Sequence, residues 1–156
     1  MTPMDLYEAL KYIHILAAVA WVGGVIRGHV HGAWVNRKDA DPSEMLRYIQ
    51  LEAFLGQRYY MPASIIVVLA GVGMVLESGW NFSDTWIVIG IVLYLTSVVI
   101  GAVVLTPQSE KIVAGLAAGP PDAALQETIK KVVLLSRIDL VILVLVIADM
   151  VIKPGT

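Results

Sequence analysis

The sequence predicts an all-α integral membrane protein, a four-helix bundle with helical extensions on the cytoplasmic side. Of its 156 residues, 58% are hydrophobic and 15% are charged. A water-soluble domain of this length cannot bury so much apolar surface. The apolar residues also gather in four long stretches, each near the length of about 20 residues that a helix needs to cross the hydrocarbon core. The length suits one domain covering residues 1–156.

The four predicted spans cover residues 10–35, 61–78, 85–105 and 132–152. Val and Ile are frequent in them and would favour strands in water. In lipid the helix is favoured, because it satisfies every backbone polar group within the segment. No basic residue precedes Lys11, so we expect the first span to be retained rather than cleaved as a signal peptide.

The connection before the second span carries signals for the start of a helix. Asp41, Pro42 and Glu44 fit an N-cap, a proline at the first helical position and an acid in the first turn. They predict a helix over residues 45–60 that leads into the second span, with Pro62 as a candidate kink.

The later connections carry signals for the ends of helices as well as for their starts. Residues 79–84 predict a tight turn between the second and third spans. Pro107 is expected to bend the third span, whose helix continues to about residue 118. Residues 119–121, Gly-Pro-Pro, should end that helix, and Asp122 should begin the next one.

Lysine and arginine are distributed unequally between the two sides of the predicted bundle. Only Lys11 and Lys153 lie on the side of the termini. The two longer connections hold seven of the others: Arg37, Lys38, Arg47, Arg58, Lys111, Lys130 and Lys131. The positive-inside rule therefore predicts that these connections face the cytoplasm. Both termini would lie outside it, in a protein of the bacterial inner membrane.

Small residues recur along the first span. Ala20, Gly24, Gly28 and Gly32 follow one another at four-residue spacing and so share one helix face. Such a face lets another backbone approach closely, and we expect it to serve helix packing.

Charged side chains within a span are costly and are expected to face the bundle interior. Arg27 lies in the first span, and Asp139 and Asp149 lie in the fourth. Because these spans run in opposite directions, Arg27 falls at the depth of Asp139, and His14 falls at the depth of Asp149. If the two helices are neighbours, Arg27 and Asp139 form a buried pair, and Asp149 accepts a hydrogen bond from His14.

His14 has two interpretations. It is either a packing residue that is hydrogen-bonded within the bundle or an axial ligand to haem b. Trp21 and Gly28 follow it at seven-residue spacing, on the same face. They would supply an aromatic wall and a gap for a flat macrocycle.

No second histidine can complete a haem site within the chain. His29 lies about 22 Å from His14 along the helix. A sixth ligand would be Met150, Met74 or a residue of a second subunit, and an open position is the remaining option. His29 and His31 are a weak candidate metal site, because on a regular helix their side chains point about 200° apart.

Several function classes are excluded. The chain has no cysteine, so disulfides, thiolate metal sites and cysteine nucleophiles are absent. Its net charge is −2, and no basic face predicts nucleic-acid binding.

The residues from Tyr12 to Gly24, YIHILAAVAWVGG, resemble the first helix of a group of small bacterial membrane proteins. The group includes the copper-resistance protein D family, the HemJ-type protoporphyrinogen oxidases and a branch of short membrane proteins that this chain resembles most. The resemblance to the HemJ-type enzymes implies haem b at His14. Their essential lysine in a later helix has no match here, so protoporphyrinogen oxidation is not the leading prediction.

Three functions are therefore open. The leading prediction is a haem-b-binding membrane protein in electron transfer or redox chemistry. The alternatives are a structural or accessory subunit without a cofactor, and a small transporter or copper-handling protein. The expected partners are the lipid bilayer and a second copy or a larger membrane complex.

Overall fold

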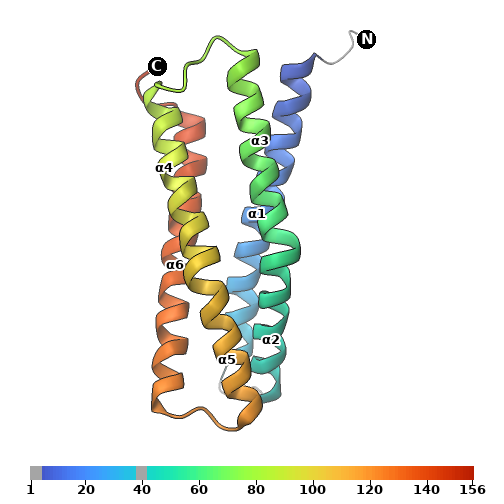
Figure 1. Ribbon diagram of the computed structural model, residues 1–156, viewed down its shortest axis with the longest axis vertical. Coiled ribbons are helices and arrows are strands. Elements are labelled where there is room, and N and C mark those ends of the chain that lie inside the picture. The colour runs from blue at the N-terminus through green and yellow to red at the C-terminus, as the bar shows by residue number, and fades with distance from the viewer. Residues whose placement is uncertain (1–4, 38–41) are drawn as a thin grey trace.

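The computed structural model describes residues 5–37 and 42–156, which form helices joined by short turns and loops, without strands (Figure 1). Its elements, in order, are α1 (Leu6–Val35), α2 (Pro42–Leu55), the π-helical turn η1 (Gly56–Tyr60), α3 (Met61–Glu77), α4 (Thr85–Val99), the π-helical turn η2 (Ile100–Leu105), α5 (Thr106–Ala118) and α6 (Ala123–Ile152).

These elements form four upright rods, because α2, η1 and α3 are continuous, as are α4, η2 and α5. Figure 1 shows the rods side by side, with the C-terminus and the described start of α1 at the same end as the loop between α3 and α4. α1 packs mainly on α3, α4 packs mainly on α6, and α5 lies beside α2. The all-α prediction is confirmed for the described residues.

Three of the rods are long and apolar enough to cross a membrane: α1, residues 43–77 and residues 85–118. α6 is not in this class, since its apolar half also contains Arg137, Asp139 and Asp149. The outward faces are rich in apolar side chains. Leu76 and Val151 are among the most exposed, at 70% and 77%. Such faces fit a lipid surrounding better than water.

Both prolines expected to disturb a helix follow a π-helical turn. η1 ends two residues before Pro62, and η2 ends two residues before Pro107. A proline cannot donate to the carbonyl four residues earlier, and its ring clashes with that carbonyl. The wider π turn takes up this mismatch without ending the rod. At the second site, the Thr106 hydroxyl donates to the carbonyl of Gly101 at 3.0 Å.

The predicted stop and start signals around α5 and α6 are confirmed. α5 ends before Gly119, whose φ of +153° suits glycine. The Asp122 side chain caps α6 by accepting from the backbone N–H of Leu125 at 2.7 Å. Residues 78–84 form the tight connection between α3 and α4. The N-cap predicted at Asp41 lies outside the described residues.

The buried centre of the bundle lies at its middle depth. Trp21 and Val22 of α1 meet Ala63 of α3 and Leu143 of α6 there. The Trp21 ring also contacts Tyr94 of α4 edge-on, with 5.9 Å between the ring centroids. One side chain or more from each rod thus closes this level of the bundle.

Candidate functional site

The glycine face of α1 receives large side chains of α2 and η1. A Cβ atom built on Gly28 would lie 2.8 Å from a carboxylate oxygen of Glu52, so a larger residue there would displace that carboxylate. The expectation of a close backbone partner is therefore corrected, because side chains fill the space. The pairs are Gly24 with Tyr60, Gly28 with Glu52, and Gly32 with Tyr48.

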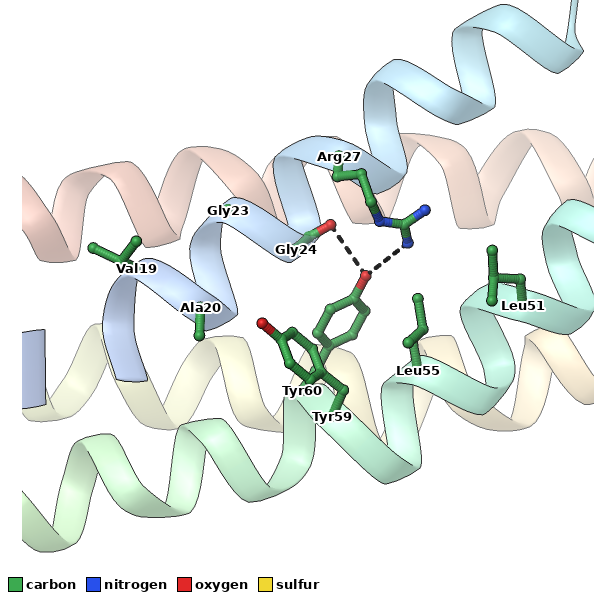
Figure 2. A pocket seen from close by; sticks show the side chains of 9 residues that line it. All are labelled: Val19, Ala20, Gly23, Gly24, Arg27, Leu51, Leu55, Tyr59 and Tyr60. Atoms are coloured by element: carbon green, nitrogen blue, oxygen red, sulfur yellow. Dashed lines mark hydrogen bonds between the residues drawn. The ribbon is translucent and has the colours of Figure 1, made fainter. Parts of the chain in front are cut away.

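Arg27 lies at the centre of a polar network on this face. Its Nη2 donates to Oε1 of Glu52 and, at 3.2 Å, to the hydroxyl of Tyr60. That hydroxyl lies 3.1 Å from the carbonyl oxygen of Gly24 and 3.1 Å from Oε2 of Glu52. A phenol carries one proton, so it donates to one of these two acceptors at a time. Figure 2 shows the Tyr60 hydroxyl between Arg27 and Gly24.

A groove of about 530 Å³ runs between α1 and the rod made by α2 and η1 (Figure 2). Its walls are mostly apolar, and the Arg27 side chain, 42% exposed, supplies its charge. The groove thus combines a cationic group with room for a hydrocarbon chain. It is lined by Val19, Ala20, Gly23, Gly24, Arg27, Leu51, Leu55, Tyr59 and Tyr60.

Arg27 does not pair with Asp139 as predicted, since the carboxylate that meets it is Glu52. The comparison of depths between antiparallel spans fixes a level but not a direction around the helix axis. Arg27 faces η1 and α2, whereas Asp139 faces α4. The sequence did hold a signal for Glu52. Tyr48 and Glu52 are four residues apart, as are Gly28 and Gly32, the α1 glycines that they contact.

Asp139 belongs to a second group of polar residues, inside the bundle. Its side chain is buried beside the hydroxyl of Ser97 on α4, and it interacts electrostatically with His29 of α1. Three buried atoms here lack a hydrogen-bond partner among the described residues: Asp139 Oδ1, Ser97 Oγ and His29 Nε2. Such buried atoms are normally satisfied by water or a ligand.

His14 faces α3. Its Nδ1 lies 2.8 Å from the carbonyl oxygen of Val67, and a carbonyl can only accept, so Nδ1 carries the proton. The ring lies 3.3 Å from the position that a Cβ on Gly71 would occupy. In the neutral ring the lone pair then lies on Nε2, for which no hydrogen bond is found among the described residues.

The structure does not bring Asp149 to His14. Asp149 lies against Gly90 of α4, 3.2 Å from where a Cβ would stand there, and Met150 packs on the same glycine. Neither carboxylate oxygen of Asp149 has a partner among the described residues. The predicted hydrogen bond from His14 is thus not formed, because α6 presents this carboxylate to α4 rather than to α1.

The other predicted companions of His14 also lie elsewhere. The Trp21 ring packs in the bundle core, and Gly28 is covered by Glu52. Asp149 and Met150 of α6 pack against α4, so the predicted haem residues do not surround one slot. His14 is held by its contact with Val67 of α3 and meets none of them.

His29 and His31 point to different surroundings. Nδ1 of His29 donates to the carbonyl of Val25 in its own helix at 2.9 Å. The His31 ring contacts Tyr48 and Trp34, with centroids 5.1 and 6.3 Å away. Across residues 5–37 and 42–156, no three histidine or acidic side chains gather in a way that could hold a metal ion.

The long apolar rods and the polar groups between them define an integral membrane protein. The chain belongs to a family described as predicted integral membrane protein, DUF2269, whose model matches residues 8–154. No curated protein and no solved structure matches the chain at a significant level.

Proposed function

We propose that this chain is a four-span protein of the bacterial inner membrane that binds haem b through His14 and works in electron transfer or redox chemistry. In this proposal α6 is the fourth span. The lower ends of the rods, with α2 and α5, extend into the cytoplasm, and both termini lie outside.

The tautomer of His14 carries the proposal. A histidine that ligates a metal through one nitrogen generally donates its other N–H to a carbonyl or carboxylate, which fixes the ring. The bond from Nδ1 of His14 to Val67 supplies this contact from a neighbouring helix. His29 also donates from Nδ1 to a carbonyl, but its Nε2 is buried within the bundle.

The fit to haem rests on this one ligand. Trp21, Gly28, Asp149 and Met150 take no part, so a second protein ligand, if there is one, would come from Met74 or from a second copy of the chain. Bound haem would supply one-electron chemistry. The chain itself would hold the imidazole plane against α3 and keep bulk water away.

Reduced-minus-oxidised absorption spectra of the protein, expressed with ample haem and purified in detergent, test the proposal. We expect a haem b spectrum that His14→Ala removes and His31→Ala preserves, with both variants eluting as folded protein. A wild type without a Soret band, or a folded His14→Ala variant with an undiminished band, would contradict haem binding here and favour a subunit without a cofactor.

A second candidate, a small transporter, is favoured by the interior carboxyl groups. Asp139 and Asp149 are buried in a helix of the bundle, and neither has a salt-bridge partner in the described chain. Acidic groups inside a membrane commonly mark ion or proton paths.

Proton or cation uptake by proteoliposomes tests this candidate. We expect flux that Asp139→Asn abolishes and Glu127→Gln leaves intact, since Glu127 lies on an exposed face with Lys131. Flux equal to that of empty vesicles would eliminate the transporter reading.

A further inference from the structure

The groove beside Arg27 has the features of a site for an amphiphile with an anionic head. Three N–H groups of this guanidinium, on Nε and Nη1, have no partner among the described residues, since Nη2 makes both bonds to Glu52 and Tyr60. The side chain is 42% exposed. In a chain that spans a membrane, exposed guanidinium N–H groups need an acceptor, because hydrocarbon provides none.

Arg27 lies where the rods change from apolar to polar. Its hydrogen bond to Tyr60 places Arg27 at the level of η1. Arg58 of η1 is exposed as well. On α6, Arg137 is exposed two residues from Asp139, which interacts with His29 of α1. Exposed arginines near one level are typical of the interface, where phosphate groups of lipids lie and long cationic side chains reach them.

The apolar part of the groove leads from this level along α1. Val19 lies two turns from Arg27 on the membrane side, and Ala20 and Gly23 lie between them. A Cβ at Gly23 would meet no atom within 4 Å, so the groove floor is open there. The space thus continues from a phosphate-binding group into the depth at which an acyl chain lies.

We propose that this groove binds one phospholipid of the leaflet on the α2 and α5 side. Its phosphodiester accepts hydrogen bonds from Arg27, and one acyl chain lies over Gly23 toward Val19. Planar guanidinium groups pair well with phosphate oxygens, since two parallel N–H groups can be shared. Glu52 holds the guanidinium in position from the other side.

Native mass spectrometry of the detergent-solubilised protein, titrated with dioleoyl phosphatidylglycerol, tests the proposal. We expect one retained lipid per chain and a higher thermal midpoint. Dioleoylglycerol, which lacks the phosphate, should be retained about tenfold less, and inorganic phosphate should produce no shift. Equal retention of the two lipids would contradict recognition of the phosphate.

Three variants locate the site. Arg27→Gln combined with Glu52→Gln leaves no unpaired charge and should lower retention about tenfold. Gly23→Leu should lower it by filling the groove while leaving Arg27 in place. Arg58→Gln is the matched control, an exposed arginine of η1 outside the groove lining, and it should retain the lipid as the wild type does. Retention unchanged in both groove variants would overturn the proposal.

Discussion

At the scale of single residues, the two adjacent tyrosines of η1 differ in the hydrogen bonds of their hydroxyl groups. The Tyr60 hydroxyl bonds to Arg27 and to Gly24 or Glu52, whereas the Tyr59 hydroxyl has no hydrogen bond in the described ranges. Tyr60→Phe should lower the free energy of unfolding by about 1 kcal/mol or more, since it strands part of a half-buried network. Tyr59→Phe should change it little.

Denaturation in mixed micelles measures this contrast. The two rings contact each other, with centroids 5.7 Å apart, and each variant keeps that contact. The difference between the variants therefore reports the hydroxyl group alone. Equal losses would mean that the network around Tyr60 does not form.

A double-mutant cycle tests which carboxylate pairs with Arg27. Arg27→Gln and Glu52→Gln should show a coupling energy of about 1 kcal/mol, reduced from a buried value because the guanidinium is half exposed. The effects of Arg27→Gln and Asp139→Asn should add within about 0.5 kcal/mol. Coupling to Asp139 in place of Glu52 would restore the pairing first predicted from depth.

The partners of these residues show what the sequence could predict. It identified His14, Arg27, Asp139 and Asp149 as polar residues at membrane depth, because charge inside an apolar stretch is visible in one dimension. Pairing needs the direction of each side chain around its axis, which packing of all four rods determines. The sequence therefore contained no indication that His14 contacts α3, and for the contact of Arg27 with Glu52 it held only the shared four-residue spacing.

At the scale of elements, two glycines of α1 should respond oppositely to the same substitution. Gly28→Ala places a methyl group 2.8 Å from Glu52, so the carboxylate must move and the pair with Arg27 weakens. Gly23→Ala meets no atom within 4 Å and should stabilise the helix by about 0.5–1 kcal/mol through lower backbone entropy in the unfolded chain. Thermal unfolding of the two variants under identical conditions measures this, and similar losses would contradict the packing of α2 on this face.

Helix ends were easier to predict than helix interiors. Asp122 and Gly119 act through bonds within a few residues, so local sequence is enough to place them. The prolines at 62 and 107 indicated where the rods would be disturbed. That each disturbance is a π turn rather than a break is visible only in the structure.

At the scale of the whole molecule, the orientation in the membrane and the crossing by α6 are open to one experiment. The chain has no cysteine, so a single introduced cysteine can be labelled without background. Ser83 lies exposed in the loop between α3 and α4, and Ala124 lies exposed at the start of α6. Thr156 is the last residue, beyond the other end of α6.

A membrane-impermeant maleimide on intact cells should label Ser83→Cys and Thr156→Cys. It should label Ala124→Cys only after the membrane is opened. The reason is that the lysines and arginines of the two longer connections resist translocation, which keeps the Ala124 end of α6 inside. Labelling of Ala124→Cys and Thr156→Cys from the same side would show that α6 does not cross. The reverse pattern at all three positions would leave four spans but invert them, and the leaflet proposed for the Arg27 lipid would then be the outer one.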